Sequence, residues 1–567
     1  MKILQNIKQL IEKDTHFLFL FTLVSITLLR IFQAFLGYAE MDSGLYGTGA
    51  LYINDFPSSM VYWSRYYLSF LLSTIFTDGS FLALRLMQVV SDVLLFVAIW
   101  YFLKQYISKI SIIIGSFLYT FLTATQFQEY SYNNVSIFLF VIAAIALYKG
   151  LERDKYWYII ASSFCIAISV LARFPNILAF SIFLFVPFYY YTQDKPIFSK
   201  ILFKQTVFFS IGAILGIMVS VILLLTTGHF DFVWQTIVAL FSMVTNNDTA
   251  YSSGSLLNAL FIQYGVAWRV LLQFVFFLFV STWLFSFIKN KFIRFGGLFL
   301  IFAYTAYSLF TLNLLPYVSY ALAMYVFFNA LFYAKLSSTQ KHLLFFALFL
   351  LLVYPMGSAT PIGFAGSFSF IFVFPIITSL LISNDIEKPF FSAISDKERS
   401  QFKTLIFLLL ITIFGLSFFK FAAYEQDRKT HALVQRATIN SPMAKGILTS
   451  TAKATEINKL LAEFGPFVKN QPCIINFHPT LLYLMEAKPY GVYYPNWLDN
   501  TALIEEYLTV AMAEQKALPL LLFEKNNQSI FDNTVYNFVS LHDSLIVVKE
   551  TDTHILYAPM SYQNANQ

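Results

Sequence analysis

Long apolar runs separated by short polar segments make up the chain as far as residue 423. A helix needs about 20 predominantly apolar residues to cross the hydrocarbon layer of a bilayer. By that measure the pattern predicts about thirteen spanning helices, and hence an all-α polytopic membrane domain over residues 1–423. The expected spans are 15–36, 82–103, 110–126, 132–149, 156–172, 175–192, 204–227, 264–288, 295–313, 317–335, 342–356, 364–383 and 404–423.

Two longer segments, 37–81 and 228–263, interrupt this series. Each contains an apolar, aromatic stretch, 58–76 in the first and 229–243 in the second. Stretches of this kind are typical of helices that lie in the membrane interface. A true span over 58–76 would invert every later loop, so we predict two long outer loops that carry interfacial helices.

After residue 423 short apolar stretches alternate with helical patterns. Strands are predicted at 472–477, 518–523, 544–548 and 553–559, and helices at 449–464, 500–515 and 527–540. Strands alternating with helices indicate an α/β arrangement. We therefore predict a small α/β domain over residues 424–567, which is large enough for a core of its own.

The charged residues fix the expected orientation. Only 12% of residues are charged, against about 25% in soluble domains, and the net charge is +6. Lysine and arginine cluster before the first span and in alternate loops, which places those loops and the N-terminus in the cytoplasm. An odd number of spans then places 424–567 outside the cytoplasm. The positive charge is thus explained by topology, and no nucleic-acid partner is expected.

Two carboxylates are expected at the outer face. Asp42 follows the first span, and Glu129 lies in the short loop between the third and fourth spans. A carboxylate there can take a proton from an attacking hydroxyl or help to hold a metal ion. The alternatives are a helix N-cap for Asp42 and an ordinary solvated acid for Glu129. Asp55, before Phe56 and Pro57, is interpreted as a turn residue.

Few cations are expected on the outer side. Arg65, Arg85, Arg173 and Arg269 are the candidates for binding an anionic lipid phosphate. Charges within spans are costly and usually face a cavity or a partner. Arg85 and Asp92 share roughly one helix face, so an ion pair between them is the alternative for Arg85.

Four further polar or aromatic residues are candidates for a substrate-binding loop: Tyr46, Asn133, Asn134 and His229. Interface anchoring is the alternative for Tyr46, and helix capping is the alternative for the two asparagines. The stretch "GAILG" at 212–216 predicts close packing between helices.

The order of these features resembles the GT-C fold of integral membrane glycosyltransferases, especially the bacterial relatives of the protein O-mannosyltransferase and aminoarabinose transferase group. Four sequence features carry the resemblance. They are "AEMDSGLYGTGALYI" after the first span, "QEYSYNNVSIFLF" before the fourth, "LARFPN" at the end of a later span, and the α/β tail.

The resemblance implies an inverting hexosyl- or pentosyltransferase at the outer face of a bacterial plasma (inner) membrane. The donor would be a polyprenyl-phosphate sugar, and the acceptor a glycan, lipid or protein. Asp42 would match the catalytic base, Glu129 the second-loop acid, and Arg173 would lie near the lipid phosphate. An Asp-Glu pair common in the family is Asp42-Ser43 here, which leaves open whether Asp42 and Glu129 hold a divalent cation such as Mg or Mn.

Two other classes remain open at this point. A transporter or flippase for lipid-linked saccharides would carry charges deep in several spans and pseudo-repeats. A polymerase or ligase of such saccharides would use outward arginines and a histidine in a large loop, and Arg65, Arg173 and His229 fit that description.

Overall fold

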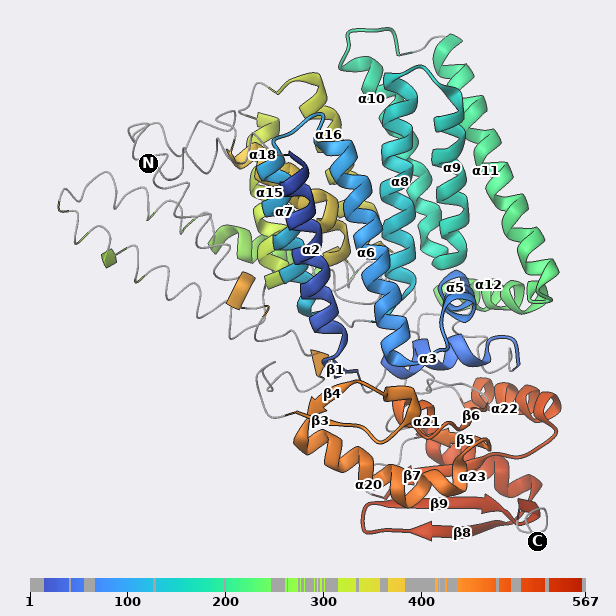
Figure 1. The fold of residues 1–567 in the computed structure, drawn as a ribbon. Coiled ribbons are helices and arrows are strands. Elements are labelled where there is room, and N and C mark those ends of the chain that lie inside the picture. Colours follow the sequence, from blue (N-terminus) through green and yellow to red (C-terminus); the bar gives the residue numbers. More distant parts are fainter. Residues whose placement is uncertain are drawn as a thin grey trace.

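The structure is a computed structural model, and its helices form a bundle with an α/β region at one end (Figure 1). It describes residues 15–39, 42–55, 67–125, 129–197, 200–245, 264–273, 315–332, 336–356, 366–382, 436–475, 479–490, 501–525 and 530–562. Single residues and short pieces between 258 and 300 and between 414 and 425 complete the described part of the chain.

The bundle consists of long apolar helices that run side by side (Figure 1). They are α2 (Thr15–Ala34), α6 (Phe81–Leu103), α7 (Lys109–Leu122), α8 (Tyr132–Glu152), α9 (Tyr156–Ala172), η3 (Phe174–Leu184) with α10 (Phe185–Tyr191), α11 (Lys200–Thr226), α15 (Leu315–Phe332), α16 (Ser338–Val353), and η4 (Gly366–Ser369) with α18 (Phe370–Ile382). Five of these helical segments are long and apolar enough to cross a membrane: α2, α6, α8, η3–α10 and α11. By length and composition, these segments indicate a membrane protein.

The total of thirteen spans stays a prediction. The expected spans at 264–288, 295–313 and 404–423 lie wholly or partly outside the described residues. The predicted helix contact at "GAILG" is confirmed, because Gly212 of α11 lies so close to the backbone of Ile160 in α9 that a Cβ atom would overlap it.

Three shorter helices lie at the end of the bundle that faces the α/β region: α3 (Asp42–Tyr52), α5 (Tyr67–Phe76) and α12 (Phe230–Thr245). α3 and α12 run across the axes of the long helices (Figure 1). The helices expected inside the two long loops are therefore present over the described residues 67–76 and 230–245. Their placement on the outer side of a membrane stays a prediction.

The C-terminal region contains a five-stranded sheet of order β6-β5-β7-β9-β8. β5 (Pro472–Ile475) pairs in parallel with β6 (Lys488–Pro489) and β7 (Leu520–Glu524), whereas β9 (His554–Pro559) is antiparallel to β7 and β8 (Leu545–Glu550). The helices are α20 (Thr451–Val468), α21 (Pro479–Leu484), α22 (Thr501–Gln515) and α23 (Ile530–His542). The predicted α/β class is confirmed. Sequence reasoning missed α21 and the hairpin of β3 (Arg436–Thr438) and β4 (Leu448–Ser450).

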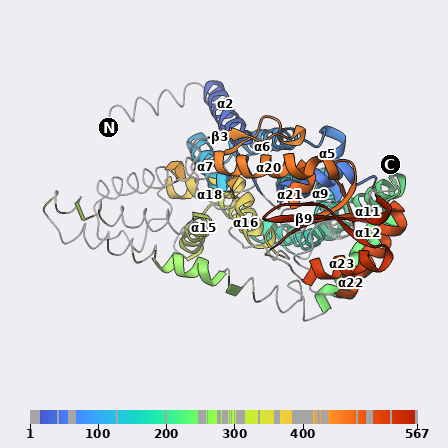
Figure 2. The ribbon, with the colours of Figure 1, turned by 90° about the horizontal axis from the view of Figure 1, so that it is seen from below.

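The α/β region is joined to the first turn after α2. β1 (Gly37–Tyr38) pairs in parallel with β2 (Tyr424–Glu425), and the backbone N–H of Leu448 donates to the carbonyl of Phe35 at 2.8 Å. Buried side chains of α3, α5, α12, α21 and the sheet contribute to one apolar cluster, which includes Tyr46, Phe70, Phe232, Tyr483 and Leu522. Figure 2 shows the α/β region lying across the ends of α6, α9 and α11. The α/β region thus packs directly against this end of the bundle.

Candidate functional site

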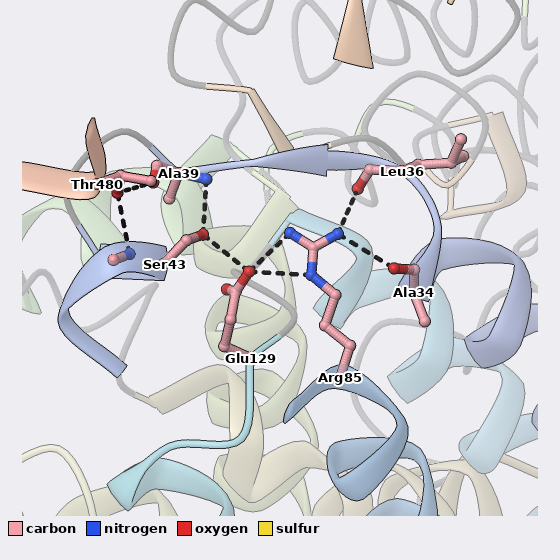
Figure 3. Close-up of polar contacts among 8 residues, drawn as sticks. Ala34, Leu36, Ala39, Ser43, Arg85, Glu129 and Thr480 are labelled. Carbon is pink, nitrogen blue, oxygen red and sulfur yellow. Dashed lines mark hydrogen bonds and ion pairs between the residues drawn. The ribbon is translucent and has the colours of Figure 1, made fainter. Parts of the chain in front are cut away.

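Glu129 lies at the centre of a buried polar cluster between the bundle and the α/β region (Figure 3). Its Oε1 atom accepts hydrogen bonds from Nε of Arg85 at 2.9 Å, from Nη2 of Arg85 at 2.6 Å and from Oγ of Ser43 at 2.8 Å. Both Glu129 and Arg85 are 1% exposed. A buried ion pair is tolerated only when good geometry and further hydrogen bonds compensate the loss of water, and this pair has both.

Arg85 also closes the end of α2. Its Nη1 atom donates to the carbonyls of Ala34 at 3.2 Å and Leu36 at 3.1 Å. The last carbonyls of a helix have no partner within the helix, so a guanidinium that reaches them acts as a cap. One side chain of α6 thereby joins the end of α2 to the loop that carries Glu129.

Asp42 is the first residue of α3, and its side chain lies outside the described part of the chain. Its neighbour Ser43 donates to Glu129 and accepts from the backbone N–H of Ala39 at 2.8 Å. Because consecutive Cα atoms lie 3.8 Å apart, the Cα atom of Asp42 is within about 9 Å of the Glu129 carboxylate. The two loops singled out in the sequence therefore meet at one place.

The α/β region contributes directly to this place. The hydroxyl of Thr480 donates to the carbonyl of Ala39 at 2.8 Å and accepts from the N–H of Gly44 at 2.9 Å. Sequence reasoning missed Thr480, because nothing in a short stretch of α21 indicates a contact with a loop 436 residues earlier.

A second residue of α21, Tyr483, also packs against the bundle end and α3. Its ring stacks on Phe81 with centroids 4.7 Å apart, and its hydroxyl donates to the carbonyl of Gly79. The ring also lies against Gly47 of α3, where a Cβ atom would overlap it. The absence of a side chain at Gly47 thus allows the close approach of α3 and α21.

The structure gives several candidates partners that the sequence did not predict. Glu129 was expected to act on substrate or to hold a metal ion; its Oε1 atom accepts hydrogen bonds from Arg85 and Ser43, and the expected role stays a prediction. Arg85 was expected to bind phosphate or to pair with Asp92. It pairs with Glu129, and Asp92 pairs instead with Arg30 of α2 at 3.1 Å. Seven residues separate Arg85 from Asp92 by about 10 Å along the helix, so the two meet different partners.

Arg173 likewise binds backbone carbonyl groups in this structure. It follows α9 and donates from Nη1 to the carbonyl of Tyr354 at 2.7 Å and from Nη2 to that of Met356 at 2.8 Å. The hydroxyl of Tyr354 donates to Oδ1 of Asn133 at 2.9 Å. These contacts join the ends of α8, α9 and α16 and give Arg173 and Asn133 structural partners, while their expected binding roles stay predictions.

Two more candidates from the predicted substrate loop have structural partners. Oδ1 of Asn134 accepts from the backbone N–H of Ser131 at 3.0 Å, so Asn134 completes a capping box at the start of α8, as the alternative predicted. Tyr46 is 3% exposed and packs edge-to-face on Phe70. It belongs to the apolar core, which does not match a sugar-stacking surface.

The remaining candidates do not join the Glu129 cluster in the described part of the chain. Nδ1 of His229 lies 3.1 Å from the hydroxyl of Tyr67, and burial lowers the pKa of His229 below its usual value. Arg269 is exposed on a segment whose Trp268 ring packs on Phe328 of α15. Arg65 lies outside the described residues.

The described residues do not fit a divalent cation at this place. Over that part of the chain, no group of three or more His, Cys, Asp and Glu side chains lies close enough to hold a metal ion. The Oε1 atom of Glu129 lies 2.6 Å from the Arg85 guanidinium, whose positive charge opposes a second cation there. No chemical step is therefore assigned to a metal.

No protein-family model matches the chain, and a comparison with curated proteins gives no significant match. The resemblance to GT-C glycosyltransferases accordingly rests on the order of the sequence features.

Proposed function

We propose that the protein is an inverting glycosyltransferase of the GT-C type, which moves a sugar from a polyprenyl-phosphate donor to an acceptor at the outer face of the membrane. One observation carries this proposal. Asp42 opens α3 at the end of the bundle where the first loop, the Glu129 loop and the α/β region meet. A lipid-linked donor presents its headgroup at the membrane surface, whereas a nucleotide sugar stays in the cytoplasm.

The proposed step needs one base and one stabiliser of the leaving group. The acceptor oxygen attacks the anomeric carbon while Asp42 takes the acceptor's proton. The bond between the anomeric carbon and the phosphate oxygen breaks, and polyprenyl phosphate leaves with the electron pair. Positive charge beside that phosphate would stabilise the transition state. Arg65 and Arg269 remain candidates for this role, because Arg85 and Arg173 are bound to the backbone.

A transporter or flippase of lipid-linked saccharides is the second candidate, and the buried pair of Arg30 and Asp92 is the observation in its favour. Charges inside spans often line transport paths. Here, however, Arg30 also donates to Gln33 at 3.1 Å and to Thr123 at 2.5 Å, and it lies over the Tyr119 ring. A charge held by so many neighbours stabilises helix packing, which favours the enzyme. A polymerase or ligase of such saccharides is the third candidate.

The test is sugar transfer in proteoliposomes supplied from outside with polyprenyl-phosphate sugars and candidate acceptors. Asp42→Asn should lower the rate at least about 100-fold, since a general base contributes that much or more. The control is Asp55→Asn, because Asp55 is exposed beyond the end of α3 and should be dispensable. Transfer at the wild-type rate by Asp42→Asn would refute the assignment. Movement of labelled lipid across the bilayer without transfer would favour the transporter, and an EDTA arm tests the need for a metal.

A further inference from the structure

Thr480 supplies the start of α3 with a cap from the far end of the sequence (Figure 3). The first N–H groups of a helix have no partner within the helix, and a side chain just before the helix normally accepts from one of them. The N–H of Gly44 is such a group, and its acceptor is the Thr480 hydroxyl, 436 residues later in the chain. The Thr480 side chain is fully buried, so water does not substitute for it.

A second hydroxyl, that of Ser43 in α3 itself, links the same segment to the bundle through Glu129. Ser43 accepts from the N–H of Ala39 and donates to Glu129, while Thr480 binds the carbonyl of Ala39. Both backbone groups of Ala39 are thus occupied, the N–H by Ser43 of α3 and the carbonyl by Thr480 of the α/β region. Asp42 lies between Ala39 and the bonded pair Ser43-Gly44. Its backbone is therefore pinned on both sides.

We propose that Thr480 is a positioning residue that acts through α3, and this role rests on the proposed function of Asp42. A base must lie within hydrogen-bond reach of the proton it takes. A displacement of about 1 Å can lower a rate about 100-fold. By fixing the backbone around Asp42, the α/β region completes the site, and the bundle alone would lack a correctly placed base.

The experiment compares Thr480→Val, which keeps the shape but lacks the hydroxyl, with Thr480→Ser, which keeps the hydroxyl. Thr509→Val is the matched control, because Thr509 is an exposed threonine of α22 in the same region. Amide hydrogen exchange of the peptide 39–47 is measured beside transfer kinetics. In Thr480→Val we expect exchange about tenfold faster in that peptide. We expect a kcat about 10- to 100-fold lower at nearly constant KM, because only a group placed for the transition state is lost. Thr480→Ser and Thr509→Val should behave as wild type.

The two readouts separate this proposal from the proposed function. Unchanged exchange in Thr480→Val would show that the Thr480 hydroxyl does not hold the backbone around Asp42, whatever reaction the protein performs. Faster exchange with an unchanged kcat would overturn the positioning role. A rise of equal size in β7 would also overturn it, by showing that the hydroxyl serves the fold as a whole. Absence of transfer by the wild type would count against the proposed function. The exchange measurement would still show whether Thr480 holds the backbone around Asp42.

Discussion

The buried pair of Arg85 and Glu129 should stabilise the contact between α6, the end of α2 and the Glu129 loop. A double-mutant cycle tests this expectation. Glu129→Leu leaves a guanidinium that is 1% exposed without its counter-charge, and Arg85→Met leaves a buried carboxylate and two carbonyls, those of Ala34 and Leu36. Removing one partner of a buried pair costs about 3–5 kcal/mol. The double substitution leaves neither charge behind. Its cost should therefore be at least about 2 kcal/mol smaller than the sum of the two single costs.

The measurement is the free energy of unfolding of the wild type, the two single variants and the double variant in one detergent. The pair of Lys469 and Glu486 is an internal control with a similar N–O distance of 2.8 Å, but the two side chains are 52% and 25% exposed. Its cycle of methionine substitutions should give a coupling below about 1 kcal/mol. Additive costs for Arg85 and Glu129, or a Glu129→Leu protein as stable as wild type, would refute the structural reasoning.

Transfer activity separates a structural role of Glu129 from a catalytic one. If Glu129 only fastens helices, the stabilised double variant should regain transfer activity relative to Glu129→Leu, whereas a reacting carboxylate could not be replaced in this way.

Two further predictions concern neighbouring elements. Gly47→Ala should lower the free energy of unfolding by about 1–3 kcal/mol and expose the α21 contact to protease, because the new Cβ overlaps the Tyr483 ring. Gly265→Ala in the helical residues 264–273, where no neighbouring atom lies within 4 Å of the added Cβ, should be neutral or stabilise by up to about 1 kcal/mol, and equal effects of the two would contradict the close approach. His229 should make stability pH-dependent: burial lowers its folded-state pKa, so its contribution is present above the unfolded-state value of about 6.5 and is lost as the pH falls. Thermal midpoints at pH 7.5 and 5 should therefore differ more for wild type than for His229→Gln, and an equal difference would count against the buried neutral imidazole.

The elements that could be predicted from sequence are those set by local pattern. An apolar run long enough to cross a bilayer indicates α6, α8 or α11 without further information, and short apolar stretches between helical patterns indicate β7 and β9. The helices inside the two long loops were predictable from the apolar, aromatic stretches that those loops contain. β3 and β4 are three residues each, too short for any periodicity to show.

The site was predictable only in part, because its contacts are set by tertiary pairing. Outward placement singled out Asp42 and Glu129, and the structure brings their loops together. The partner of Arg85 was not predictable, since helix spacing favours Asp92, whereas the Glu129 loop comes from outside the helix. Arg173 and Asn133 look like binding groups in the sequence because nothing there shows that backbone carbonyls and Tyr354 will engage them.

The link between Gly44 and Thr480 has a consequence for the order in which the protein is made. The chain is synthesised at about 5–20 residues per second, so the 436 residues between these partners take about 20–90 seconds to appear. Arg85 and Glu129 are only 44 positions apart and can pair long before that. The bundle can therefore form its ion pair during synthesis, whereas the hydrogen bond to Gly44 forms only after Thr480 has been made. If the proposed activity is correct, a partly synthesised chain in the membrane stays inert until its end has been made.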